Sequence, residues 1–131
     1  MKTLFVGDVH GCASTLRALL EQAQAERVIL LGDLFAKGPD PAGVWELIRE
    51  YRAESVMGNH DARLLECWGR PGSSKSGHYE TARKLDEECR HWLQGLPVFI
   101  HGEDWTAVHA GVHPDAGWEG TSQKQALSMR R

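Results

Sequence analysis

Short apolar runs alternate along the chain with longer segments in which apolar residues recur every three or four positions. The short runs, several of them β-branched and closed by glycine, predict buried strands. The longer segments have the spacing of amphipathic helices, which bury one face. Strands are predicted at residues 3–6, 28–31, 55–57, 98–100 and 105–108, and helices at residues 14–25, 62–68 and 79–94 and after the Asp40-Pro41 pair.

The order of these elements predicts an α/β fold. Strands that alternate with helices of this length form a mainly parallel sheet with helices against it. The last two strands are joined by residues 101–104, which predicts a hairpin. We expect a single domain over residues 1–131, with a surface loop at the glycine- and serine-rich residues 69–77. Ser122, with Gln125 three residues later, is a capping box that predicts a last helix.

The composition is that of an ordinary globular protein with a slight excess of negative charge. The 131 residues include 15 Lys and Arg against 18 Asp and Glu, which gives a formal net charge of −3. This balance argues against a nucleic-acid polymer as partner, because such partners need a basic surface. No apolar run approaches the roughly 18 residues of a membrane span, so we expect no membrane partner. Three cysteines without a C-x-x-C pair favour a reducing compartment, and we expect a cytoplasmic protein.

Polar side chains follow the predicted strands at the points where the strands end. Asp8 and His10 follow the first strand, Asp33 the second, Asn59 the third and His109 the last. The carboxyl ends of parallel strands lie along one edge of a sheet, where ligands bind. We therefore expect these five side chains to converge, and the glycines beside them to allow a close approach to a ligand.

The convergent side chains suit divalent metal ions. Carboxylate oxygen, imidazole nitrogen and amide oxygen, without a thiolate, are ligands for Mn²⁺, Fe or Zn²⁺ rather than for a structural zinc. The carboxylate of Asp33 has two oxygens and can bridge two cations. Two such cations can hold and deprotonate a water between them and stabilise an in-line displacement.

Four motifs follow the strands in order: Asp8-Val9-His10-Gly11, Gly32-Asp33 with Lys37-Gly38-Pro39, Gly58-Asn59-His60-Asp61, and His109-Ala110-Gly111. Their order and strand context resemble the metal-dependent phosphoprotein phosphatase superfamily, also called the calcineurin-like phosphoesterases. The match runs from residue 3 to about residue 130. The resemblance implies the αββα sandwich of that superfamily, with a mainly parallel sheet and a hairpin.

The same resemblance implies roles for individual residues. One divalent ion would be held by Asp8, His10 and Asp33, and the other by Asp33, Asn59 and His109. His60 would be the general acid for the leaving oxygen, and Lys37 and Arg130 would hold phosphate oxygens. The implied cofactors are two divalent metal ions, with Mn²⁺ preferred and Fe or Zn²⁺ as alternatives.

The residues around Lys37 distinguish two branches of the superfamily. Protein serine/threonine phosphatases have Asp-Arg-Gly where this chain has Ala36-Lys37-Gly38, and that aspartate orients the general-acid histidine. Symmetrical diadenosine tetraphosphatases have alanine there, and their His-Ala-Gly segment continues to a proline and a tryptophan, similar to Pro114 and Trp118. The chain is therefore closer to the tetraphosphatase branch. Lys37 departs from the arginine of both branches, and a lysine offers a point charge rather than a bidentate fork.

The leading hypothesis is a metal-dependent phosphohydrolase in which a hydroxide bridging two cations attacks phosphorus and His60 protonates the departing oxygen. The preferred substrate is a small-molecule dinucleoside polyphosphate such as diadenosine tetraphosphate. A serine/threonine protein phosphatase is the alternative within the superfamily. An inactive metal-binding fragment is the alternative of another class.

The C-terminal part of the sequence is the reason for considering an inactive metal-binding fragment. The superfamily continues with further strands and a Gly-His segment that completes the second metal site, whereas only His113 follows His109 here. Either the sequence is the N-terminal part of a longer family domain, with its second sheet incomplete, or its second metal has one protein ligand fewer. The last predicted helix stops within its first turns, which favours truncation.

Other polar residues near the motifs have simpler interpretations. Asp61 is interpreted as a carboxylate that opens a helix and interacts with its dipole, rather than as a ligand. His78 and His91 fall on predicted helix surfaces and His101 in a turn, so we expect solvated side chains. Cys12 is expected to be a small packing residue rather than a nucleophile.

Overall fold

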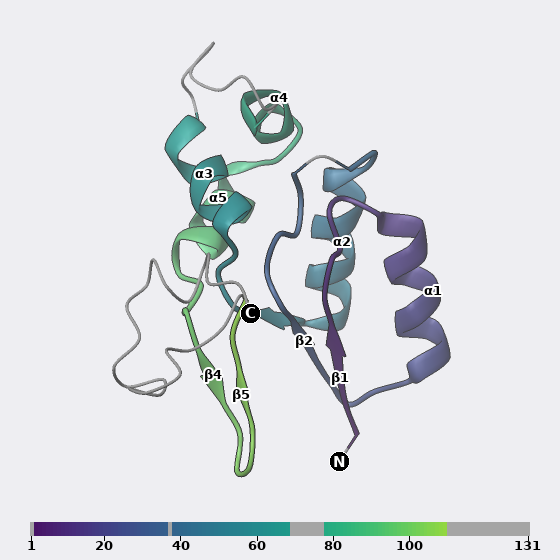
Figure 1. Ribbon diagram of the computed structural model, residues 1–131. Coiled ribbons are helices and arrows are strands. Elements are labelled where there is room, and N and C mark those ends of the chain that lie inside the picture. The colour runs from purple at the N-terminus through teal and green to yellow at the C-terminus, as the bar shows by residue number, and fades with distance from the viewer. Residues whose placement is uncertain (1, 37, 69–77, 110–131) are drawn as a thin grey trace.

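The computed structural model describes residues 2–36, 38–68 and 78–109, and helices and strands alternate over most of this length (Figure 1). The strands are β1 (Thr3–Val6), β2 (Arg27–Leu30), β3 (Glu54–Ser55), β4 (Ile100–His101) and β5 (Thr106–Ala107). The helices are α1 (Ala13–Ala23), α2 (Pro41–Tyr51), α3 (Asn59–Cys67), α4 (His78–Arg83) and α5 (Glu87–Gln94).

The predicted parallel sheet is confirmed. Strands β1, β2 and β3 are neighbours in that order, with Thr3 opposite Arg27 and Ile29 opposite Glu54. Strands β4 and β5 pair antiparallel in a second sheet, with Ile100 opposite Ala107, so the predicted hairpin is confirmed as well. Parallel pairing of the first three strands brings their carboxyl ends to one edge, which is the requirement for the predicted site.

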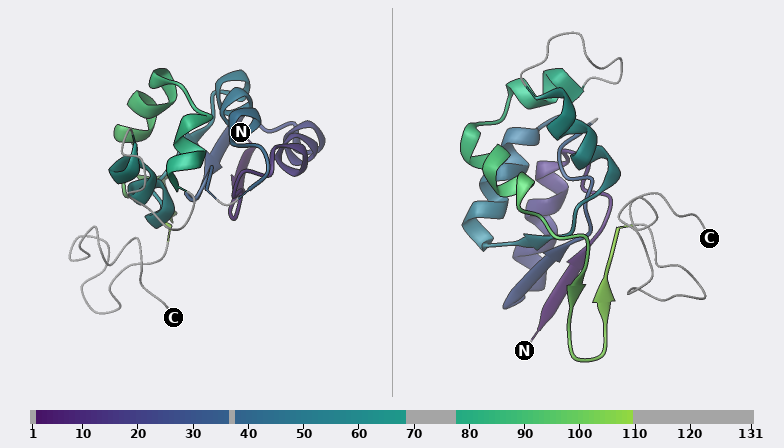
Figure 2. Two further views of the ribbon diagram at one scale, coloured as in Figure 1. Left: turned by 90° about the horizontal axis from the view of Figure 1, so that it is seen from above. Right: turned by 90° about the vertical axis from the view of Figure 1, so that its left-hand side faces the viewer.

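Both faces of β2 are covered, as a central strand requires. Val28 and Leu30 point into the main core, which helices α1 and α2 complete with Leu16, Leu20 and Val44. Ile29 lies between them in sequence and faces the other way, where it packs with Val56 and Ala107. Alternate residues of a strand point to opposite faces, so the hairpin β4–β5 covers the face that α1 and α2 leave open (Figure 2).

Two aspartates begin helices by accepting backbone N–H groups. The carboxylate of Asp40 accepts from Gly43 N at 3.0 Å, and Pro41 occupies the first helical position, as predicted. The carboxylate of Asp86 accepts from Cys89 N at 2.8 Å and begins α5.

The single helix predicted over residues 79–94 is wrong. The structure has α4 and α5 there, with a turn at residues 84–86 between them. Lys84 N donates to Thr81 O and Leu85 N to Ala82 O, both at 3.1 Å, and these short-range bonds end α4. Asp86 then caps a new helix start, because its side chain competes for the N–H groups that a continuous helix would use.

Several predictions fall outside the described residues. They concern Lys37, the loop 69–77, Pro114, Trp118, Arg130, His113 and the capping box of Ser122 and Gln125.

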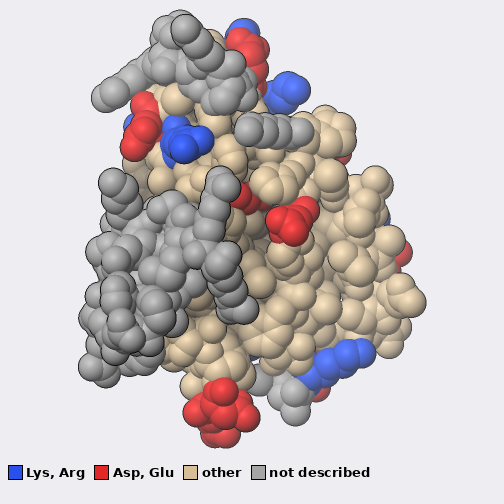
Figure 3. All heavy atoms as spheres, viewed as in Figure 1, with Lys and Arg blue, Asp and Glu red and all other residues tan. Residues whose placement is uncertain are grey.

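Among the residues that the structure describes, the helices are too short and too polar for any of them to span a bilayer. On the face shown in Figure 3, acidic side chains gather at the tip of the hairpin, where Glu103 and Asp104 are exposed.

Candidate metal centre

The loops after β1 and β2 are joined by backbone hydrogen bonds at the carboxyl edge of the sheet. His10 N donates to Asp33 O at 2.9 Å, and Gly11 N donates to Leu34 O at 2.8 Å. Residues that lie more than twenty positions apart in the sequence are thereby fixed side by side. The structure thus brings the loop that carries His10 to the loop that carries Asp33.

Three predicted ligands have left-handed backbone conformations. The φ angles are 54° at Asp8, 42° at His10 and 53° at Asp33, although none of these residues is glycine. Such conformations cost about 1 kcal/mol or more each and persist where the surrounding structure compels them, often at functional sites. The loops are therefore shaped for the placement of these side chains rather than for local backbone preference.

Asp33, Asn59 and His109 form one compact polar group. Nε2 of His109 lies 3.2 Å from Oδ2 of Asp33 and 2.9 Å from the side-chain amide of Asn59. With its NH₂ turned toward them, Asn59 donates to Nε2 of His109 and to both carboxylate oxygens of Asp33, the latter at 3.2 Å. With its oxygen there instead, Asn59 becomes a third acceptor, and only a proton or a cation stabilises three acceptors that face one another.

The other ring nitrogen of His109 is held by the backbone. Nδ1 lies 2.7 Å from Leu31 O, which can only accept, so Nδ1 carries a proton and donates it. Nε2 is then the nitrogen that binds either a proton or a metal ion. A histidine fixed in this way by a backbone carbonyl is the usual arrangement for a metal ligand.

Electrostatics favour a negative charge on Asp33. Burial raises the pKa of this carboxyl, but hydrogen bonds from the His109 ring and from the backbone N–H of His60 outweigh burial and hold the pKa below its usual value. The hydrogen bond to Asp33 in turn raises the pKa of His109 against the effect of burial. A proton on Nε2 and a divalent cation therefore compete for the same position beside Asp33.

Asp8 and His10 form a second, more open pair. Nε2 of His10 lies 3.9 Å from Oδ1 of Asp8, whose side chain is 97% exposed. Nδ1 of His10 is buried and has no hydrogen-bond partner in the described part of the chain. Nδ1 is closed off from solvent, so Nε2, which faces Asp8, is the ring nitrogen through which His10 could bind a cation.

His60 lies between these two groups. Its backbone N–H donates to Oδ1 of Asp33 at 2.9 Å, and its ring lies edge-to-face with the ring of His10, with centroids 6.0 Å apart. Nδ1 of His60 lies 3.1 Å from Nε2 of His78, the first residue of α4. The expectation of a solvated His78 is wrong, because this side chain is 1% exposed.

The carboxylate of Asp61 links the loops that carry Asp33 and Asn59. It accepts from the backbone N–H groups of Asp33, Leu34 and Gly58 at 2.8, 3.0 and 2.8 Å, and it is 1% exposed. Burial raises the pKa of Asp61 to about 6, against the effect of these hydrogen bonds. Asp61 begins α3 as expected, and it also ties α3 to the loop after β2, which local sequence could not indicate.

The residues present fit a divalent cation. Donor atoms of Asp33, Asn59 and His109 lie 2.9 to 3.2 Å apart. Neighbouring ligands on a metal ion with bonds of about 2.1 Å have a similar spacing. Within the described residues, no three His, Cys, Asp or Glu side chains form a cluster that could hold a metal ion; the Asp33 group depends on the amide of Asn59 as its third donor.

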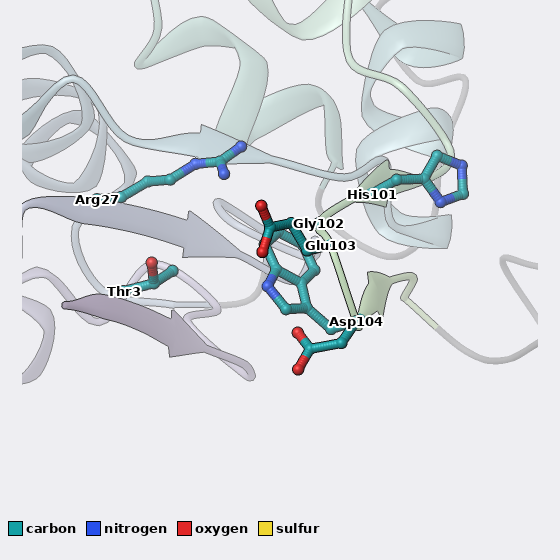
Figure 4. A pocket seen from close by; sticks show the side chains of 7 residues that line it. Thr3, Arg27, His101, Gly102, Glu103 and Asp104 are labelled. Carbon is teal, nitrogen blue, oxygen red and sulfur yellow. The ribbon is translucent and has the colours of Figure 1, made fainter. Parts of the chain in front are cut away.

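A separate pocket lies at the opposite ends of the strands (Figure 4). It is lined by the start of β1 and β2 and by the turn of the hairpin. Arg27 is already engaged there, with Nε and Nη2 at 2.6 and 2.9 Å from the carboxylate of Glu54 and its guanidinium over the ring of Trp105. The Asp33 group is at the other end of the sheet, so this pocket does not belong to the candidate metal centre.

The cysteines show no sign of catalytic use. Cys67 and Cys89 are buried, and burial raises the pKa of Cys89 to about 12. Cys12 is half-buried, with Sγ 3.7 Å from His10 O. This placement agrees with the expectation of a packing residue at Cys12.

Comparison with known proteins identifies the family to which the chain belongs. The family model of the calcineurin-like phosphoesterases matches residues 1–128, and the chain belongs to that family. The family takes its name from phosphoesterase activity, which is the hydrolysis of phosphoester bonds.

Curated relatives of the chain have a more specific name than the family. A protein of Actinobacillus succinogenes named symmetrical bis(5'-nucleosyl)-tetraphosphatase is 32% identical over 126 residues, which cover 88% of this chain and 46% of the relative. A protein of the same name from Pectobacterium carotovorum subsp. carotovorum is 36% identical over 127 residues, with 87% and 44% covered. The chain spans about half the length of these curated relatives.

Solved structures confirm the fold. A crystal structure of a protein provisionally assigned as a diadenosine tetraphosphatase superposes with a TM-score of 0.86 at 31% identity, over 98% of this chain and 59% of that one. A metallophosphoesterase from Sphaerobacter thermophilus superposes with a TM-score of 0.72 at 33% identity, over 87% of this chain and 48% of that one. The metallophosphoesterase fold expected from the motifs is therefore confirmed.

Proposed function

We propose that the chain belongs to a phosphohydrolase that cleaves dinucleoside polyphosphates, such as diadenosine tetraphosphate, with two divalent cations, Mn²⁺ by preference. The observation that supports this most is the Asp33, Asn59 and His109 group, in which a carboxylate, an amide and an imidazole meet within 3.2 Å. In this proposal that group holds one cation, and Asp8 and His10 hold the other together with Asp33.

In this proposal, different residues of the chain have different roles in hydrolysis. Divalent cations bound here would neutralise phosphate charge and make water a better nucleophile at neutral pH. Asp33 would supply negative charge to both cations. The hydrogen bond from Nδ1 of His109 to Leu31 O keeps Nε2 of His109 directed at Asp33. Lys37 and Arg130 are proposed to bind phosphate oxygens.

His60 is proposed to donate the proton to the departing oxygen. Its backbone N–H is bonded to Asp33, so the residue is fixed beside the proposed cations while its ring remains a separate functional group. A general acid in such a position contributes about a hundredfold or more to the rate.

Replacing His60 with asparagine is therefore expected to lower kcat about a hundredfold while bound metal per chain stays the same. The backbone N–H that binds Asp33 survives the substitution, which is why metal binding should persist. Steady-state kinetics and elemental analysis of the same sample measure both quantities. His91→Asn, on the exposed surface of α5, is the matched control. A parallel loss of metal would identify His60 as a ligand instead.

The substrate class is proposed from two observations. The curated relatives described above are named as symmetrical tetraphosphatases. Ala36, buried at 2% exposure, offers only a methyl group where the protein phosphatases place their aspartate. Both favour a nucleotide anhydride over a phosphorylated protein side chain.

A direct comparison of substrates tests this proposal. The chain, freed of metal and reloaded with Mn²⁺, is expected to release ADP from diadenosine tetraphosphate at least about tenfold faster than phosphate from a phosphoserine peptide at equal concentration. Faster turnover of the peptide would contradict the tetraphosphatase assignment. No release from either substrate, with Mn²⁺ bound, would contradict catalysis by this chain and favour a metal-binding fragment.

A further inference from the structure

His78 is a buried histidine that the function proposed above does not use. It is the first residue of α4, and its side chain is 1% exposed. A buried imidazole must be hydrogen-bonded to offset its lost hydration. Its Nε2 lies 3.1 Å from Nδ1 of His60, which is a hydrogen-bonding distance.

The geometry of the two rings indicates a nearly linear hydrogen bond. The ring planes differ by 15°, and the ring centroids are 5.3 Å apart. For two ring nitrogens 3.1 Å apart, the centroids are farthest from each other when both nitrogens lie on the line between the centroids. The observed separation is close to that maximum, so the nitrogens lie close to this line. The rings therefore meet edge to edge in almost one plane, where a lone pair and an N–H point directly at each other.

The surroundings of His78 restrain it. Helix α4 lies beside α3, the helix that carries His60, as Figure 1 shows. Ala82, one turn further along α4, is 4% exposed and belongs to the main hydrophobic core. His78 is thus attached to a packed helix rather than to an exposed loop, and its Nε2 is a fixed partner for His60.

We propose that His78 is a positioning residue for His60, an inference that rests on the proposed role of His60 as general acid. Nε2 of His78 accepts the hydrogen bond from Nδ1–H of His60, so His60 keeps a proton on Nδ1 throughout. The proton that leaves is the one on Nε2 of His60, which lies across the ring from Nδ1. In the step, the Nε2–H bond breaks and an O–H bond forms on the departing oxygen, and His60 becomes neutral. His78 neither gains nor loses a proton.

The test combines a double-mutant cycle with a spectroscopic measurement on the full chain. His78→Phe keeps an aromatic ring but removes the acceptor, and His78→Gln restores an acceptor at a similar reach. With diadenosine tetraphosphate and Mn²⁺, His78→Phe is expected to lower kcat about tenfold, and His78→Gln is expected to restore most of it. In the His60→Asn background, His78→Phe should have no further effect, because the group that it positions is gone.

Nitrogen-15 NMR of the histidine rings measures the positioning without substrate. Wild type should show His60 with its proton on Nδ1, and His78→Phe should lose that preference while the bound metal stays unchanged. Equal loss of kcat by His78→Phe in both His60 backgrounds would make His78 merely structural and overturn the inference. So would a His60 ring without a proton on Nδ1 in wild type. A wild-type chain that fails to release ADP would refute the proposed function instead. The NMR measurement would then still show whether Nδ1 of His60 donates a hydrogen bond to His78.

Discussion

Replacing Asp33 with asparagine is expected to reduce ADP release from diadenosine tetraphosphate by at least about a hundredfold. Mutating a residue that merely orients a metal ligand lowers metal affinity or activity about ten- to a hundredfold. Asp33 is proposed to bind both cations directly, so its loss should cost at least the upper value. The substitution keeps the shape of the side chain and an oxygen that can accept from His60 N, now 2.9 Å from Oδ1. Turnover and bound metal per chain, measured on one preparation, check the expectation, and both should fall.

The same substitution at Asp104 provides the control. Asp104 is exposed in the turn of the hairpin, at the opposite end of the strands from the candidate metal centre. Asp104→Asn changes the net charge by the same amount and should leave turnover and metal content unchanged. Near-normal activity of Asp33→Asn would mean that the proposed metal centre is wrong.

Replacing Gly58 with alanine is expected to destabilise the fold by about 2–3 kcal/mol and to impair metal binding. A Cβ at this position would overlap the backbone N and Oδ1 of Asp33, and it would lie 3.0 Å from Oδ2 of Asp61. Backbone atoms cannot move aside as a flexible side chain can, so the loops that carry Asp33 and Asn59 must separate. Thermal unfolding and metal analysis measure the two effects.

Gly95→Ala is the matched control for Gly58→Ala. Gly95 follows α5, and a Cβ there would meet Trp92 O at 3.6 Å and His91 O at 3.9 Å, both ordinary contacts. We expect its unfolding temperature and its metal content to stay close to those of the wild type. If Gly58→Ala behaves in the same way, the close packing of the two loops is not what places Asp33.

The sheet and its edge were predictable because their signals are local. The apolar runs at the first three strands are short, and glycines follow them closely, so the positions of β1, β2 and β3 are correct to within two residues at each end. Parallel pairing then follows from the helices between the strands. Since parallel pairing places the carboxyl ends together, the meeting of the loops that carry His10 and Asp33 was also within reach of the sequence.

The break between α4 and α5 was not predictable from periodicity. Leu85, Cys89, Trp92 and Leu93 have helical spacing, and a pattern of this kind does not show where the backbone bonds change partners. Asp86 is the residue that carries the signal, since aspartate is a preferred helix N-cap. The apolar residues on either side of it continue the helical spacing, and this hides the cap signal.

Burial of the two polar partners also lay beyond sequence reasoning. His78 and Asp61 are both 1% exposed, yet each stands in a segment whose polar residues are mostly solvated. Their burial depends on how α3 packs against α4 and how Asp61 meets the loop after β2, which are contacts between distant segments. The short distances from His78 to His60 and from Asp61 to Asp33 N follow from that packing.

Residue types and their order along the chain were therefore enough to establish the family, the sheet and the chemistry of the donor atoms, because each of these depends on neighbours in sequence. The relative placement of Asp33, Asn59 and His109, the exposure of Asp8 and the partnership of His60 with His78 came from the folded chain. These are contacts between side chains far apart in sequence, and packing of the helices and loops sets their distances.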